Sequence, residues 1–296
     1  MASQIDTLLL NSSTKTQIKA FINEPSGALL ISGKAGSGKK GLARHAAAIL
    51  LDVDYERLGN HPHFLAITKP ADKSEIPIDS VREVINKLSL RATTSRQTRL
   101  NRVFIIEDAQ YLSTEAQNAL LKLLEEPPAR TLIILTADSE DNLLPTVVSR
   151  TQRVSVAPPS LEQSIKYFND KPEAGVKSAY LLSQGSSELL SALLIDEDNH
   201  PLKVGVSQAK DYISNNTYRR MIQLQQLSKD KAGLTIFLDG LARVLSALHA
   251  ESIRHSRANS SKILASRQAV EAAISQIDHN ANTRLTMLAL ALNTTI

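Results

Sequence analysis

The chain of 296 residues contains no cysteine. Disulfide bonds, zinc sites made of thiolates and catalysis by a thiol are therefore excluded together. Two membrane signals are also missing: no cationic segment followed by an apolar stretch stands near the start, and no apolar run approaches the length that spans a bilayer. We therefore expect a cytoplasmic protein that has neither a membrane partner nor a zinc site.

Aromatic residues are scarce, at 4%, and the formal net charge of +4 is modest. A mild positive charge is compatible with a nucleic-acid partner but is also common on solvated surfaces. Basic side chains are scattered without interleaved aromatic residues, so the sequence marks no surface that would stack on bases. The length predicts about two domains, and 42% hydrophobic residues with 22% charged ones are ordinary for a globular chain.

A glycine-rich turn, Gly33-Lys34-Ala35-Gly36-Ser37-Gly38-Lys39-Lys40, separates an apolar run from a helix-like stretch over residues 41–51. Glycines let the backbone adopt positive φ, so that successive N–H groups point inward at an anion, and the new helix adds its positive dipole end. The alternative is a strand-to-helix turn that merely needs glycine, and the strand, turn and helix context argues against it. The turn therefore predicts a phosphate-binding loop.

The spacing of this turn fits G-x-x-x-x-G-K, with Gly33, Gly38 and Lys39 in place. Lys39 is expected to reach the β- and γ-phosphates of a bound nucleotide, ATP or ADP. The next position should carry a Ser or Thr hydroxyl for Mg²⁺, and Lys40 stands there. We expect Lys40 to turn its charge outward and leave the hydroxyl ligand missing, so Mg²⁺ binding is doubtful.

Two carboxylates, Glu107 and Asp108, end the continuous apolar run 103–106, which is typical of a strand buried on both faces. In phosphate-loop ATPases an aspartate here holds Mg²⁺, and in many a neighbouring glutamate polarises the attacking water. The order is inverted in this chain. Moving the motif by one residue, so that Asp108 became the metal ligand, would not restore the site, because the Asp108 side chain would lie on the opposite face of the strand. If Mg²⁺ binds, Glu107 or Asp108 is the candidate ligand.

The pattern of apolar runs predicts an α/β fold with a parallel five-stranded sheet, followed by helices only. A helical lead-in over residues 5–22 precedes the first strand. Residues 196–205 contain Pro201 and Gly205 and are interpreted as a linker. The predicted strands are 28–31, 61–67, 103–106, 131–135 and 151–156, and the later helices are 160–168, 173–183 and 187–194, with 206–296 all helical.

Six motifs together resemble bacterial DNA polymerase III clamp-loader subunits, which are AAA+ proteins. The resemblance implies a phosphate-loop AAA+ core over residues 1–157, a helical lid over 158–205 and a helical collar for oligomerisation over 206–296. It covers about the first two of these parts, and the third matches only in length and helical character. The motifs are the glycine-rich turn, His61-Pro62-His63-Phe64, Ile78-Asp79-Ser80-Val81-Arg82-Glu83, Asn118-Ala119-Leu120-Leu121-Lys122, Leu124-Glu125-Glu126-Pro127-Pro128 and Ser149-Arg150.

Within that family, gamma-type subunits are ATP motors, whereas delta-prime subunits keep the fold and often lack working nucleotide chemistry. The sequence departs from the gamma type at Lys40 and at Asp108, which stands where the catalytic glutamate is expected and would be a weak substitute. No arginine follows Gly185-Ser186, and the four zinc cysteines of the family are missing. The resemblance therefore implies a delta-prime-like subunit with little or no ATPase of its own.

The resemblance also assigns roles to two further residues. Arg150 resembles an arginine finger that reaches a neighbour's ATP across the subunit interface; the alternative is an arginine that caps a helix end or pairs with a carboxylate. Thr136 and Glu107 would join the loop residues Gly33, Ala35, Gly36, Ser37, Gly38, Lys39 and Lys40 around a nucleotide. The implied partners are gamma/tau-type and delta-type subunits, primed DNA in the assembly and, indirectly, the sliding clamp. An active gamma-type ATPase or other AAA+ DNA motor, and a nucleotide-free scaffold, remain open alternatives.

Overall fold

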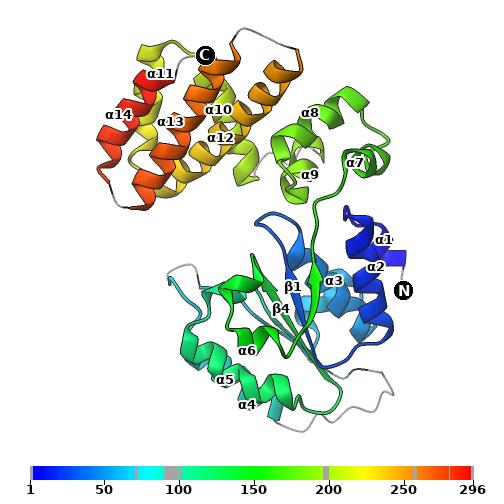
Figure 1. Ribbon diagram of the computed structural model, residues 1–296. Helices are drawn as coiled ribbons and strands as arrows, with labels where there is room; N and C mark the ends of the chain where they lie inside the picture. The colour runs from blue at the N-terminus through cyan, green and yellow to red at the C-terminus, as the bar shows by residue number, and fades with distance from the viewer. Residues whose placement is uncertain are drawn as a thin grey trace. The chain divides into compact units, whose positions relative to one another are not determined.

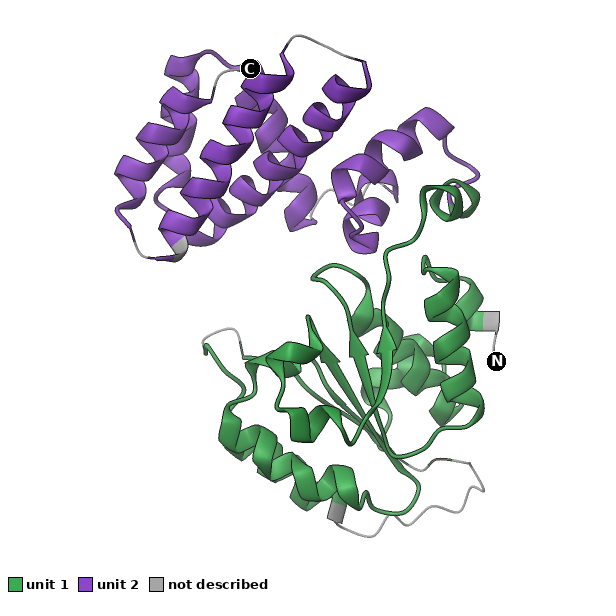
Figure 2. Cartoon of the chain, viewed as in Figure 1, with its two compact units in different colours: residues 1–167 green, residues 168–296 purple. Residues whose placement is uncertain are grey.

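The computed structural model describes residues 3–70, 73–89, 100, 102–195, 200–255, 259–279 and 281–294. The chain divides into two compact units, residues 1–167 and 168–296, which Figure 2 colours separately. Unit 1 has two hydrophobic clusters of buried residues, and unit 2 has one of its own. The three-part division at residues 157 and 205 stays a prediction.

Unit 1 is built on a five-stranded parallel sheet with the order β2-β3-β4-β1-β5, which confirms the predicted sheet (Figure 1). Because β4 lies between β3 and β1, the segments that follow these three strands meet at one edge of the sheet. The strands are β1 (Ala28–Ser32), β2 (Phe64–Ile67), β3 (Arg102–Ile106), β4 (Thr131–Ala137) and β5 (Gln152–Ser155).

Helices cover both faces of this sheet. Alternate residues of each central strand enter two separate clusters, as expected for a strand buried on both sides: Leu29 packs with α3, and Leu30 packs with α5. The first face carries α1 (Ser3–Asp6), α2 (Ser12–Asn23) and α3 (Lys39–Leu51), and the second carries α4 (Ile78–Ser89), α5 (Thr114–Glu125) and α6 (Pro145–Val148). The short helix α7 (Leu161–Tyr167) ends unit 1.

The predicted lead-in helix over residues 5–22 is wrong in its continuity, because α1 and α2 are separate. Asn11 causes the break: its side-chain oxygen accepts a hydrogen bond from the Ser13 N–H and caps α2. The Asn11 side-chain amide also donates to the Pro158 carbonyl, 3.0 Å away. A residue held from both sides in extended backbone cannot continue a helix through that point.

Unit 2 contains helices only among its described residues. The long helix α12 lies at its centre and packs on α8, α10 and α13. The other helices complete a single hydrophobic cluster. In chain order they are α8 (Glu173–Ser183), α9 (Ser187–Ile195), α10 (Pro201–Ser214), α11 (Thr217–Leu227), α12 (Lys231–Arg254), α13 (Ser260–Asp278) and α14 (Thr283–Asn293).

The interpretation of residues 196–205 as a linker is wrong for Pro201 to Gly205, which form the first turns of α10. Proline is tolerated there because the first N–H groups of a helix have no intrahelical partner. Gly205 is a packing residue: a Cβ at the facing Gly240 of α12 would lie 2.3 Å from the Gly205 carbonyl. The two glycines allow α10 and α12 to touch through their backbones.

By length and composition alone the 24-residue helix α12 is apolar enough to cross a membrane, although Asp239 and Arg243 interrupt its apolar residues. This is weak evidence for a membrane span, because the core helix of a globular unit passes the same test. Leu234, Phe237, Leu241 and Leu245 of α12 are buried in the unit 2 cluster.

Candidate functional site

The predicted phosphate-binding loop joins β1 to α3, and it consists of Gly33, Lys34, Ala35, Gly36, Ser37 and Gly38. Gly36 and Gly38 have φ values of 73° and 84°, a region that side chains disfavour, so both positions require glycine. Gly38 directly precedes α3, whose first N–H groups have no intrahelical partner. This backbone has the shape that binds an anion at a helix N-terminus.

Lys39 is almost entirely buried, with 4% of its surface exposed. Its ammonium lies 2.6 Å from Oδ1 of Asp138, the first residue after β4, and 3.5 Å from the Lys34 carbonyl oxygen. Asp138 is fixed in turn by Gln110, whose amide donates to Asp138 Oδ2 at 3.1 Å. A phosphate at this loop would therefore compete with Asp138 for the lysine.

Asp138 was not predicted from the sequence, which pointed to Thr136 as the polar residue of β4. Thr136 is fully buried, and its hydroxyl accepts a hydrogen bond from the Asp108 N–H at 3.0 Å. It therefore supports the turn that carries Asp108. Its contact with a γ-phosphate stays a prediction, and this geometry favours Asp138 as the residue of this strand end that meets Lys39.

Both carboxylates at the end of β3 pair with cations of α3. Glu107 is buried, and its Oε1 lies 2.6 Å from Arg44 Nε. Asp108 Oδ2 lies 2.5 Å from Lys40 Nζ. Lys40 and Arg44 are four residues apart and so share one face of the helix. The expectation that the Lys40 charge turns outward is therefore wrong, because a carboxylate within reach attracts it inward.

The sequence placed the two carboxylates on opposite faces of a strand, and the structure differs here as well. β3 ends at Ile106, and Asp108 has φ 55° and ψ 53°, a left-handed conformation outside the strand. The alternation of faces no longer applies at that point. Hence Glu107 and Asp108 both reach α3.

A nucleotide and its metal ion fit this arrangement differently. The positive-φ loop, the helix N-terminus and Lys39 suit phosphate oxygens. The residues present do not fit a bound Mg²⁺ ion, because Lys40 stands in place of the hydroxyl ligand and its ammonium is paired with the Asp108 carboxylate. Within the part of the chain that the structure describes, no group of three or more His, Cys, Asp or Glu residues could hold a metal.

Arg150 follows α6 and is about one-third exposed. Its Nε and Nη2 lie 2.8 and 2.5 Å from Oε1 of Glu125, the last residue of α5. Its Nη1 donates to the Thr146 carbonyl at 2.9 Å. The carboxylate pairing that the sequence left as the alternative is therefore present, and a role as a finger stays a prediction.

A family model described as "DNA polymerase III, delta subunit" matches residues 11–160. The chain belongs to this family. Its match covers the loop, the β3 carboxylates, Asp138 and Arg150, so every residue of the candidate site lies inside the matched region. The family resemblance stated from the motifs is thereby confirmed.

The similar curated proteins are also subunits of DNA polymerase III. The chain is 30% identical to DNA polymerase III subunit delta' of Pseudomonas aeruginosa over 177 residues, 54% of this chain and 53% of the relative. It is 32% identical to the Escherichia coli delta' subunit over 157 residues, 52% and 46% of the two chains. It is 30% identical to the gamma/tau subunit of Mycobacterium tuberculosis over 137 residues, 42% and 23%. The chain thus spans about half the length of the delta' relatives it matches.

Among solved structures, a DNA polymerase III gamma subunit-related protein from Thermotoga maritima is similar over 96% of this chain and 99% of its own, with a TM-score of 0.55 and 20% identity. At that identity the likeness shows the fold alone. Together with the parallel sheet, it establishes the α/β AAA+ fold with helices in the C-terminal part.

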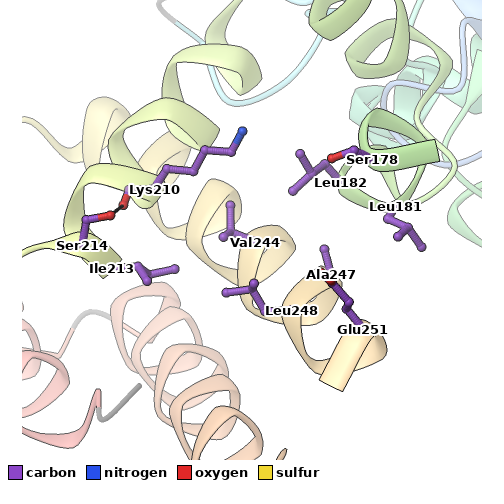
Figure 3. Close-up of a pocket in the computed structure, with 10 residues that line it drawn as sticks. All are labelled: Ser178, Leu181, Leu182, Lys210, Ile213, Ser214, Val244, Ala247, Leu248 and Glu251. Carbon is purple, nitrogen blue, oxygen red and sulfur yellow. Dashed lines mark hydrogen bonds between the residues drawn. The ribbon is translucent and has the colours of Figure 1, made fainter. Parts of the chain in front are cut away.

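Unit 2 has a groove of about 410 Å³ between α8, α10 and α12 (Figure 3). Aliphatic side chains such as Leu182, Val244 and Leu248 line it, and Lys210 and Glu251 are its charged members. Its lining residues include no glycine and so no turn of the kind that precedes α3. The candidate site therefore remains the edge of the sheet in unit 1.

Proposed function

We propose that the chain is a delta-prime-like clamp-loader subunit that supports ATP-dependent loading of a sliding clamp onto primed DNA during replication. Family membership and the delta' relatives support this function. In this proposal the chain's own nucleotide site hydrolyses little or no ATP, and Arg150 acts on the ATP of a neighbouring subunit. The proposal that this nucleotide site is degenerate rests on one observation, the pairing of Lys40 with Asp108.

The charge of Lys40 opposes metal binding. An ammonium about 4 Å from a divalent ion is repelled by roughly 8 kcal/mol at an effective dielectric constant of about 20. Mg²⁺ could approach Asp108 only after Lys40 had left, which would break a pair whose carboxylate is mostly shielded from water. ATP or ADP could still bind through its phosphates and Lys39, without a properly held metal ion.

An exposed apolar stripe supports assembly with gamma/tau-type and delta-type subunits. Leu285, Leu288 and Leu292 of α14 are 67%, 48% and 57% exposed, and their spacing of three and four residues places them on one helix face. Tyr218 and Ile222 are exposed on α11, which packs against α14. Clustered apolar side chains at a surface are typical of a protein interface. Such an assembly on DNA would place the protein in the cytoplasm.

An active gamma-type ATPase is the second candidate, and the glycine geometry of the loop with Lys39 favours it. Titration calorimetry of the purified chain with ATP, with and without Mg²⁺, separates the two functions, with Lys39→Ala as the control. We expect no binding, or binding indifferent to Mg²⁺. Tight magnesium-dependent binding and turnover, both lost in Lys39→Ala, would support the motor.

The assembly itself is tested by copurification. The tagged chain should retain gamma/tau-type and delta-type subunits from its own organism in a stable complex. Recovery of the chain without any clamp-loader subunit would overturn the proposed function.

A further inference from the structure

We propose that Glu125 is a positioning residue: it holds the Arg150 guanidinium in a defined place before a neighbouring subunit presents its nucleotide. The inference rests on the proposed function and deepens it. A hydrogen bond from Arg150 Nε to Glu125 Oε1 at 2.8 Å and an ion-pair contact from Nη2 to the same oxygen at 2.5 Å carry it. A third contact, from Nη1 to the Thr146 carbonyl at 2.9 Å, fixes the rotation of the guanidinium plane.

The two residues stand on helices that are tied to each other. Gln117, which is buried in α5, accepts a hydrogen bond from the Leu144 N–H at the start of α6, at 2.8 Å. Its amide also donates to the Leu112 carbonyl just before α5, at 3.3 Å. Figure 1 shows α5 and α6 as neighbours, and they make direct contact. Glu125 therefore has a fixed position relative to the turn that carries Arg150.

The guanidinium remains able to bind a phosphate in this position. It has five N–H donors, and the contacts to Glu125 and Thr146 use one on each nitrogen. A further donor remains on Nη1 and another on Nη2, and about one-third of the side chain is exposed. Glu125 thus fixes one edge of the guanidinium and leaves donors for an oxyanion.

Glu125 has two opposing effects on such a finger. Its negative charge weakens the attraction of Arg150 for phosphate, but half of its side chain is exposed and water screens that effect. Its hydrogen bond and ion pair with Arg150 order a long side chain, and a misplacement on the order of 1 Å can change a rate about a hundredfold. Positioning is the larger effect, so removing Glu125 should slow the reaction.

The test uses a complex of the full chain with its gamma/tau-type and delta-type subunits, and measures ATP turnover in the presence of clamp and primed DNA. Glu125→Ala should lower kcat about tenfold, while KM for ATP and the affinity of assembly stay unchanged. Glu125→Gln keeps an acceptor oxygen and should lose only about threefold. Glu126→Ala is the matched control: it removes the adjacent exposed carboxylate and should leave kcat within about twofold of the wild type.

A double variant distinguishes positioning from a general structural effect. Glu125→Ala should have no further effect on kcat in an Arg150→Ala background, because Glu125 acts only through that arginine. An unchanged kcat in Glu125→Ala, an increased kcat, or an additive loss in the double variant would each overturn the inference. Thermal unfolding of the free variants shows whether unit 1 remains folded.

The single variant Arg150→Ala distinguishes a failure of this inference from a failure of the proposed function. If it lowers kcat strongly while Glu125→Ala behaves like Glu126→Ala, the inference fails and the proposed function stands. If Arg150→Ala leaves turnover unchanged, or if no complex forms, the proposed function and the inference both fail.

Discussion

Lys40 Nζ lies 2.5 Å from Asp108 Oδ2, so the side chain that replaces the metal-binding hydroxyl is paired with the carboxylate that a metal ion would need. One turn further along α3, Arg44 pairs with Glu107 at 2.6 Å. The helix that begins at the phosphate-binding loop thus neutralises both acidic residues at the end of β3. These two ion pairs give the candidate site its own internal counter-ions.

Replacing Lys40 with serine should restore part of a magnesium response. The change removes the repelling charge, frees Asp108 and supplies a hydroxyl at the right position. We expect Mg²⁺ to tighten ATP binding by about tenfold in Lys40→Ser, as measured by calorimetry. Lys229→Ser removes an equal charge from an exposed turn outside the candidate site and is the control. Equal responses of the two variants would contradict a specific role for Lys40.

Loss of Arg44 should destabilise unit 1. Glu107 is only 4% exposed, and Arg44→Ala would leave its carboxylate buried without a counter-ion. We expect the free energy of unfolding to fall by about 1–3 kcal/mol, less than the roughly 3–5 kcal/mol for breaking a fully buried ion pair, because Arg44 is partly exposed. Urea unfolding measures this loss.

The matched test of that pair is the double variant Arg44→Ala/Glu107→Gln. It replaces the unpaired buried charge with a neutral amide and should recover part of the lost stability. A double variant that is less stable than Arg44→Ala would show that the pairing does not explain the loss.

The sequence predicted the sheet well because its strands are continuous apolar runs bounded by turn residues. The phosphate-binding loop was predictable for a similar reason, since the glycine spacing encodes its backbone. The partners of the charged residues were not predictable. Lys39 meets Asp138 and Lys40 meets Asp108 across about 100 and 70 residues of sequence, respectively, and only the parallel order of β1, β4 and β3 brings them together.

Gly205 shows a second limit of the sequence. A glycine after a proline is typical of a loop, and it suggested a linker. Glycine is needed at this position because the backbone of α12 approaches it at Gly240, 35 residues further along the chain. Close helix contact through glycine leaves no local signal.

Gly240→Ala should therefore be strongly destabilising. Its new Cβ would lie 2.3 Å from backbone atoms of Gly205, and backbone cannot give way as a flexible side chain does. We expect a loss of about 3 kcal/mol in the free energy of unfolding. Gly175→Ala on α8 is the control, because no atom lies within 4 Å of the new Cβ there. It should be neutral or stabilise by about 0.5 kcal/mol.

The apolar stripe of α14 should be required for assembly and dispensable for folding. Leu285→Lys/Leu288→Lys places two charges on side chains that already face solvent, so the thermal unfolding midpoint of the free chain should change little. In an interface core the same charges would be desolvated, and we expect affinity for the partner subunits to fall at least about tenfold. Ile253→Lys, at an exposed site near the end of α12, is the control. Analytical ultracentrifugation of the mixed subunits measures the affinity, and equal assembly of all three proteins would assign the stripe no part in the interface.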